Sequence, residues 1–128
     1  MPTPDFTLLY VDSPQTSIAF YGALLGLQPV ERSPTFALFA LESGFKLGLL
    51  ARHGVEPAAT LTGGGVEIVF TVESAATVDV TCADWQARGL SILQDPTTMP
   101  FGRTFVAIDP DGHRLRVFAP MPVAAGAR

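Results

Sequence analysis

The segment that decides the fold is residues 101–120, which read FGRTFVAIDPDGHRLRVFAP. Two runs rich in apolar residues flank the tetrapeptide Asp109-Pro110-Asp111-Gly112. Proline presets the φ angle of the second turn position, and glycine accepts the positive φ that is frequent at the fourth. The pattern therefore predicts two antiparallel strands, at about residues 103–108 and 113–118, joined by a short hairpin.

The N-terminal half begins with a strand-like run at residues 6–11, rich in aliphatic, aromatic and β-branched residues. Ser13 is a typical helix N-cap, Pro14 suits the first helical position, and Gly26 can end the helix. Three short strands are expected next, near residues 28–31, 35–41 and 45–50. Residues 52–64, which contain Pro57 and two glycines of a Gly-Gly-Gly run, are expected to be a linker without regular structure.

The C-terminal half repeats the same pattern. A strand is expected at residues 66–72, then a helix capped by Ser74 and ended by Gly89, then a strand at residues 91–94 and the hairpin. Residues 10–13 (YVDS) match 71–74 (TVES), and residues 43–49 (SGFKLGL) match 111–117 (DGHRLRV). Each half therefore reads β-α-β-β-β.

The repeat predicts an α+β fold in a single domain, residues 1–128, with module one at about 5–51 and module two at about 65–119. One helix can cover only one face of a four-stranded sheet, so each module leaves the other face open. Two modules, or two chains, can close their open faces into a cleft, which is a natural ligand site.

Composition argues against several classes of protein. The 128 residues are 48% hydrophobic and 16% charged, with a net charge of −4 and no basic cluster, which argues against disorder and against nucleic-acid binding. No apolar run approaches the roughly 18 residues of a membrane span. The N-terminus lacks the features of a signal peptide, and the single Cys82 is expected to be a buried small side chain. We therefore expect a cytoplasmic protein.

The paired modules, the segments SIAFY (residues 17–21) and LGL (25–27), and the late Asp-Pro-Asp-Gly turn resemble the vicinal oxygen chelate superfamily. That superfamily includes glyoxalase I, extradiol dioxygenases, fosfomycin-resistance enzymes and bleomycin-binding proteins. Residues 101–105 (FGRTF), together with 109–113 (DPDGH) and Arg116-Val117, look most like phenazine-antibiotic resistance proteins. The resemblance implies a homodimer with two equivalent clefts that bind an aromatic drug between subunits without transforming it.

Metal-using members of the superfamily carry ligands at four positions, which the resemblance transfers to Phe6, Gly48, Glu67 and Arg116. Divalent ions of this chemistry require His nitrogens and carboxylate oxygens, and only Glu67 supplies one. Arg116 is a permanent cation that would repel a metal. We therefore expect no metal, no other cofactor and no catalytic residues. The two histidines, His53 in the linker and His113 beside the turn, are expected to be solvated.

Glu67 and Arg116 belong to the same module and would point into one cleft. Opposite charges tolerate partial burial only when they are paired. The hypothesis is that they form a salt bridge in the former ligand positions.

Alternation of side chains along the strands predicts the rest of the cleft wall. In the strand at residues 103–108, the cleft set is either Arg103, Phe105 and Ala107, or Thr104, Val106 and Ile108; the first is preferred because the second is more apolar and core-like. Phe101 lies in a loop and is a further candidate, whereas Trp85 is expected in the core or an interface. The predicted ligand-binding residues are Phe6, Leu8, Tyr10, Leu50, Glu67, Phe101, Arg103, Phe105, Arg116 and Phe118.

This aromatic and aliphatic wall suits a small planar aromatic molecule. The predicted function is antibiotic resistance by sequestration of such a drug. Two alternatives remain open: a metal-dependent enzyme of the superfamily (lyase, dioxygenase or thiol transferase), or a fold-only relative whose cleft is filled by its own side chains and which serves a protein partner.

Overall fold

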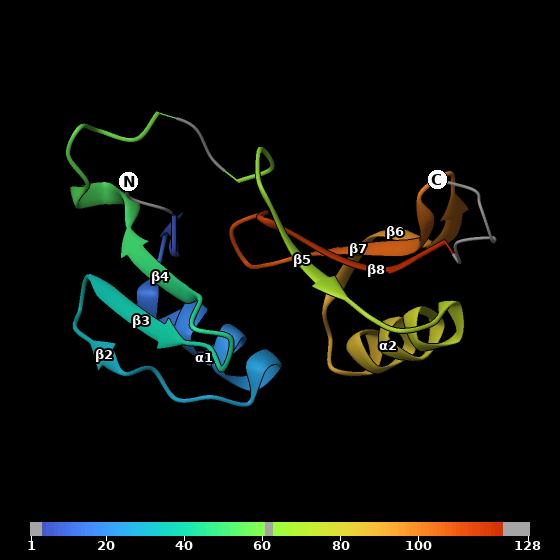
Figure 1. The fold of residues 1–128 in the computed structure, drawn as a ribbon. Helices are drawn as coiled ribbons and strands as arrows, with labels where there is room; N and C mark the ends of the chain where they lie inside the picture. The colour runs from blue at the N-terminus through green and yellow to red at the C-terminus, as the bar shows by residue number, and fades with distance from the viewer. Residues whose placement is uncertain (1–3, 61–62, 122–128) are drawn as a thin grey trace. The chain divides into compact units, whose positions relative to one another are not determined.

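The computed structural model describes residues 4–60 and 63–121. The chain divides into two compact units, Met1–Gly63 and Gly64–Arg128. Each unit contains one helix and one four-stranded mixed sheet in the order β-α-β-β-β (Figure 1). This arrangement confirms the predicted α+β fold with two repeated modules.

Unit one pairs its strands in the order β1-β4-β3-β2, with β1 parallel to β4 and the other pairs antiparallel. Its helix starts as predicted, because the Ser13 side chain accepts a hydrogen bond from the Thr16 N–H (3.2 Å), and it ends at Gly26, whose φ is 67°. In chain order the elements are β1 (Phe6–Val11), α1 (Pro14–Leu25), β2 (Glu31–Arg32), β3 (Phe36–Ala40), β4 (Lys46–Ala51) and the 3-10 helix η1 (Arg52–Gly54).

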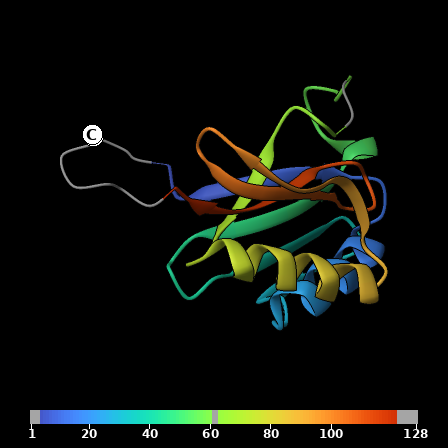
Figure 2. The same ribbon diagram turned by 90° about the vertical axis from the view of Figure 1, so that its right-hand side faces the viewer.

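Unit two pairs its strands in the equivalent order β5-β8-β7-β6, again with the first pair parallel. Figure 2 shows α2 lying along one side of this sheet. Ser74 caps the helix by accepting a hydrogen bond from the Thr77 N–H. In chain order the elements are β5 (Glu67–Thr71), α2 (Ala75–Ala87), β6 (Ser91–Met99), β7 (Gly102–Ile108) and β8 (Arg114–Pro120).

The core of unit two lies between α2 and the sheet. Trp85 packs edge-on against Phe70 and Phe105, with ring centroids 5.4 and 5.3 Å apart. Val78 and Cys82 of the same helix are buried beside them, and burial raises the pKa of the Cys82 thiol. The predicted roles of Trp85 in the core and Cys82 as a buried small side chain are both confirmed.

The hairpin turn is held by Asp109, as predicted for a turn former. One of its carboxylate oxygens, Oδ1, accepts hydrogen bonds from the backbone N–H groups of Asp111 and His113, both at 2.8 Å. Gly112 has a φ of 86°, which favours glycine. His113 differs from the expectation: it is 8% exposed and therefore buried, because it precedes β8 and continues the alternation of Leu115 and Val117, which face the core.

The two sheets have the same register. Phe6 pairs with Lys46 as Glu67 pairs with Arg114, and Leu8 pairs with Gly48 as Val69 pairs with Arg116. The internal alignment of the two modules therefore holds residue by residue along the central parallel pair.

Three boundaries differ from the prediction. Strand β6 runs to Met99 and passes through Pro96. Proline lacks a backbone N–H, and it is tolerated here because β6 is an edge strand whose register is irregular at this point. Strand β2 is only two residues long and starts later than expected. The predicted linker opens with η1, so it is not wholly irregular. Within residues 4–60 and 63–121, no helix has the length and apolarity to cross a membrane.

Candidate functional site

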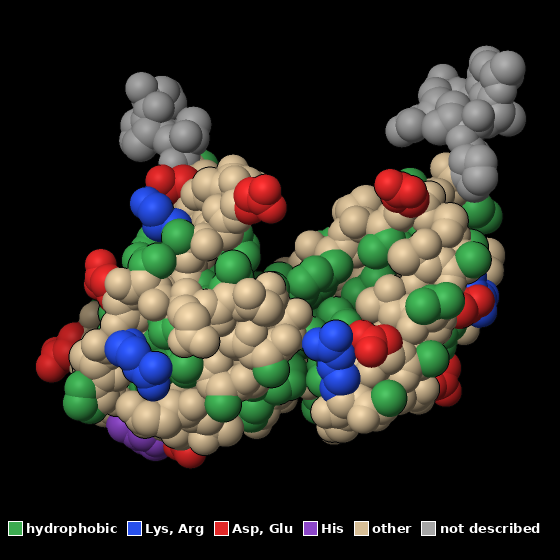
Figure 3. Space-filling view, turned by 90° about the horizontal axis from the view of Figure 1, so that it is seen from below, with side chains coloured by type: hydrophobic (Ala, Val, Ile, Leu, Met, Phe, Trp, Pro, Cys, Tyr) green, Lys and Arg blue, Asp and Glu red, His purple; other side chains and the backbone are tan. Residues whose placement is uncertain are grey.

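Each sheet has a face that its helix does not cover, here called the open face. In unit one, alternation along β1 exposes Phe6, Leu8 and Tyr10, each about two-fifths exposed, and buries Leu9 and Val11. This is the orientation predicted from the sequence. Figure 3 shows hydrophobic side chains at the surface of both units, with charged groups scattered among them.

Gly48 shapes the open face of unit one. A Cβ atom at this position would lie 2.7 Å from Leu8 Cδ1 and 2.8 Å from Phe6 Cε1. The Phe6 and Leu8 side chains therefore lie over the backbone of β4, in space that a larger residue at position 48 would occupy. Leu50, paired with Tyr10, lies half-buried on the same face.

The open face of unit two is built around a salt bridge. Arg116 Nε donates to Glu67 Oε1 at 2.7 Å and Nη2 donates to Oε2 at 2.9 Å, a two-pronged geometry. Arg116 Nη1 also donates to Thr104 Oγ1 at 3.1 Å, and that hydroxyl donates to the carbonyl of Val117 at 2.9 Å. The predicted Glu67–Arg116 pair is confirmed.

The pairing has electrostatic consequences. Hydrogen bonds from Arg116 lower the pKa of the Glu67 carboxyl below its ordinary value, against the opposing effect of partial burial. The positive charge of Arg114 lowers the same pKa further. The hydrogen bond to Glu67 raises the pKa of the Arg116 guanidinium. Both groups are thus held in their charged forms at neutral pH.

Two aromatic rings flank this pair. The guanidinium carbon of Arg116 lies 5.8 Å from the centroid of the Phe101 ring, within cation–π range. Phe101 in turn meets Phe118 edge-on, with centroids 6.1 Å apart and an interplanar angle of 70°. The loop residue Phe101 is 45% exposed, so part of this residue is accessible to a ligand.

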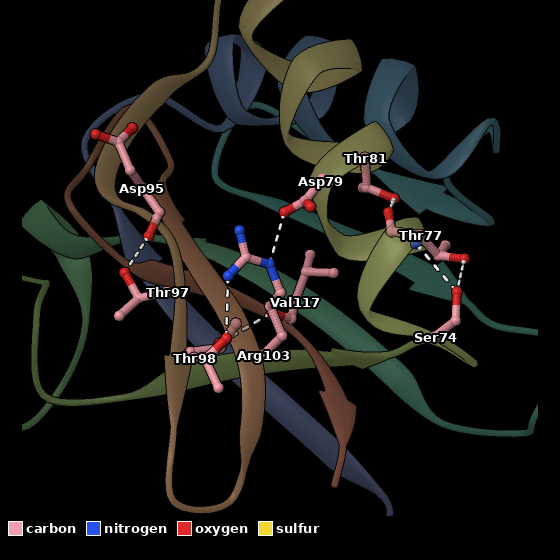
Figure 4. Close-up of polar contacts among 10 residues, drawn as sticks. Ser74, Thr77, Asp79, Thr81, Asp95, Thr97, Thr98, Arg103 and Val117 are labelled. Carbon is pink, nitrogen blue, oxygen red and sulfur yellow. Dashed lines mark hydrogen bonds and ion pairs between the residues drawn. The ribbon is translucent and has the colours of Figure 1, made fainter. Parts of the chain in front are cut away.

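The preferred assignment in β7 is wrong. Phe105 is fully buried against Trp85, and Arg103 Nε donates to Asp79 of α2 at 2.8 Å (Figure 4). Arg103 and Phe105 therefore lie on the helix-covered face, and Thr104 lies on the open face, where Arg116 reaches it. The signal that could have shown this is Trp85, a large helical ring that requires an aromatic or aliphatic partner on the covered face.

The structure thus brings Glu67, Arg116, Phe101 and Phe118 together on the open face of unit two, with Thr104 as the residue that sequence reasoning missed. Phe6, Leu8, Tyr10 and Leu50 share the open face of unit one. Phe39, by contrast, is fully buried in the core of that unit.

Comparison with known proteins agrees with this architecture. A family model described as the Glyoxalase/Bleomycin resistance protein/Dioxygenase superfamily matches residues 3–117. The chain belongs to this superfamily. It is 32% identical over 118 residues, 90% of each chain, to the phenazine antibiotic resistance protein EhpR of Enterobacter agglomerans. The predicted family is confirmed.

Solved structures of the superfamily fold are similar. Protein ATC0852 from Agrobacterium tumefaciens is 59% identical, with a TM-score of 0.88, covering 95% of this chain and 100% of the other. A glyoxalase/bleomycin resistance protein/dioxygenase from Nocardioides is 26% identical, with a TM-score of 0.83, covering 97% of this chain and 87% of the other.

The donor set of this superfamily member does not fit a metal. Phe6 and Gly48 provide no ligand atom, and Arg116 occupies the carboxylate of Glu67, the one acidic group among the four positions. In the part of the chain that the structure describes, no three His, Cys, Asp or Glu side chains form a group that could hold an ion. A metal at these positions would have to compete with a two-pronged ion pair for a single carboxylate.

Proposed function

We propose that this superfamily member binds a small planar aromatic compound, without chemical change, and protects the cell by lowering the free concentration of that compound. The observation that carries the proposal is the cluster on the open face of unit two. There a guanidinium, fixed by Glu67 and Thr104, lies beside the half-exposed ring of Phe101. A flat, delocalised cation next to an aromatic ring offers a stacking surface for a planar ligand.

Three further points support the proposal. The four former ligand positions hold one carboxylate, already engaged, and so favour binding over metal-assisted catalysis. The open face of unit one is apolar, with Phe6, Leu8 and Tyr10 exposed. A relative that covers 90% of the chain is named as a phenazine antibiotic resistance protein, which makes phenazines the first ligands to test.

Sequestration is stoichiometric and requires tight binding, with a Kd of about 1 μM or lower, or about −8.2 kcal/mol. The test is isothermal titration of the purified protein with phenazine, phenazine-1-carboxylate and acridine. Calorimetry is preferred to Trp85 fluorescence because that ring, which α2 carries, is buried against the sheet. Saturable binding is expected for at least one ring system; none across the panel would overturn the proposal.

A matched pair of variants locates the site. Phe101→Ala should weaken binding by tenfold or more, about 1.4 kcal/mol, through loss of ring contact. Phe45→Ala removes a ring that is exposed to a similar degree, 38% against 45%, and should change binding little. Equal effects of the two variants would place the ligand elsewhere.

The same preparation separates binding from catalysis. Metal analysis of protein purified without chelators should find less than stoichiometric Zn, Ni, Mn or Fe, and the ligand recovered from the complex should be unchanged. A stoichiometric ion or a converted ligand would favour an enzyme. The proposed assembly is a homodimer, and sedimentation equilibrium would reveal its mass.

A further inference from the structure

The open face of unit two carries more positive than negative charge. The charged residues that share this face along β5 and β8 are Glu67, Arg114 and Arg116, two arginines to one glutamate. Strand β7 contributes Thr104, Val106 and Ile108 to the same face, none of them charged. This local excess is opposite in sign to the whole chain, whose net charge is −4.

The two arginines differ in what they contact. Arg116 donates hydrogen bonds from Nε and Nη2 to Glu67 and from Nη1 to Thr104, and the Glu67 carboxylate matches its charge. Within residues 4–60 and 63–121, no hydrogen bond or ion pair engages the side chain of Arg114, although its charge acts on Glu67. Arg114 is half-buried, so its guanidinium is partly shielded from water while its donors remain unused.

Nearby acidic groups do not cancel this charge. Asp79 is bound to Arg103 on the helix-covered side, and Asp95 acts on Cys82 of α2. The Asp79–Arg103 pair therefore lies on the helix-covered side of the sheet.

Three side chains of β8 share the open face. Arg114, Arg116 and Phe118 alternate onto one face, so a cation, a paired cation and an aromatic ring follow one another over about 13 Å at the usual rise of a strand. Phe101 lies against both Phe118 and Arg116. A flat ring that lies against Phe101 and Phe118 could direct an acidic substituent along the strand towards Arg114.

We propose that this open face selects planar aromatic carboxylates over the neutral parent rings, with Arg114 as the group that meets the carboxylate. The inference rests on the proposed function and specifies its ligand class. A guanidinium can hold a carboxylate with two hydrogen bonds, and partial burial strengthens the attraction relative to bulk water. The charge of Arg116 is already matched by Glu67, so a second carboxylate at Arg116 would meet a neutralised guanidinium, whereas Arg114 has no such partner among the described residues.

The experiment compares the affinity ratio of phenazine-1-carboxylate to phenazine, measured by calorimetry at neutral pH. The native protein should favour the carboxylate by about tenfold or more. Arg114→Gln should reduce this ratio towards one, and Arg114→Lys should retain part of it because the charge remains. Arg88→Gln removes the same charge from the end of α2 and should leave the ratio unchanged.

The experiment distinguishes failure of the Arg114 role from failure of the proposed binding function. A native ratio of one or less, or a ratio that survives Arg114→Gln in a protein whose urea unfolding is native-like, overturns the role of Arg114 while the proposed binding function stands. If neither compound binds the native protein, the proposed function fails and this inference fails with it. The carboxylate preference should also shrink as salt rises, whereas binding of neutral phenazine should not.

Discussion

The two open faces of this protein are built on the same register and carry different chemistry. In unit one, Phe6 and Leu8 lie over Gly48 and make an apolar surface. In unit two, the equivalents of Phe6 and Gly48 are Glu67 and Arg116, which form a two-pronged ion pair. One pair of positions thus has no polar side-chain atoms, and the other forms a mutual ion pair.

The helix-covered faces differ in where their large and small core residues lie. Strand β3 places Ala37 and Phe39 against its core, and β7 places Phe105 and Ala107 at the equivalent positions, so large and small residues are exchanged. All four are fully buried. This exchange keeps one large and one small residue in each core, as close packing requires, whereas the two open faces carry different chemistry.

The largest expected effect tests the covered faces. Phe39→Ala and Phe105→Ala should each lower the free energy of unfolding by about 3–5 kcal/mol, because each leaves a cavity beside a helix. Phe6→Ala, on the open face, should cost much less in the isolated chain. Urea denaturation measures all three, and a cost for Phe6→Ala equal to that of Phe39→Ala would contradict the contrast between faces.

The Glu67–Arg116 ion pair should contribute less to the free energy of unfolding than the buried rings do. The side chains of Arg116 and Glu67 are 19% and 31% exposed, so a double-mutant cycle with Arg116→Ala and Glu67→Ala should give a coupling of about 1–2 kcal/mol. The exposed Asp84–Arg88 pair, both side chains about half exposed, is the control and should give about 0.5 kcal/mol or less. Equal couplings would show that partial burial adds nothing.

The same pair predicts a pH dependence. Because folding lowers the pKa of Glu67 from its ordinary 4.5, its stabilisation is present above 4.5 and is lost as pH falls through the lower, folded-state value. The difference in unfolding free energy between the native protein and Glu67→Gln should therefore shrink on acidification. Urea midpoints at several pH values measure it, and a difference that grows at low pH would reverse the assigned sign.

The smallest effect should come from Gly48→Ala. The added methyl group would meet only the ends of the Leu8 and Phe6 side chains, which can move, so the cost should be about 1 kcal/mol or less, at the low end for overpacking. The Phe6 ring should shift, which ring-current changes in methyl proton spectra would report. Unchanged spectra would mean that Phe6 does not lie over position 48.

Sequence patterns predicted most of the fold for identifiable reasons. Ser13, Ser74 and Gly26 mark helix ends through local hydrogen bonds and backbone angles, which depend on near neighbours. Asp109 and Gly112 mark the hairpin in the same way. The end of β6 was missed because a proline inside a strand depends on that strand lying at a sheet edge, a tertiary property.

The candidate site was only partly predictable. The Glu67–Arg116 pair followed from the repeat and from the cost of burying an unpaired charge. The orientation of β7 did not, because choosing between two alternating sets requires knowing which set meets Trp85. Thr104 was therefore assigned to the wrong face, although its hydroxyl completes the hydrogen bonding of Arg116.

The sequence by itself determined the duplicated β-α-β-β-β order and the hairpin, because these depend on residue type and spacing. Only the tertiary structure decided that Arg116 binds Glu67 with two prongs, that Phe101 lies beside it, and that Arg103 and Phe105 lie on the helix-covered face. Those facts depend on pairing between strands distant in the chain, and a shift of one residue in that pairing would turn every side chain to the opposite face.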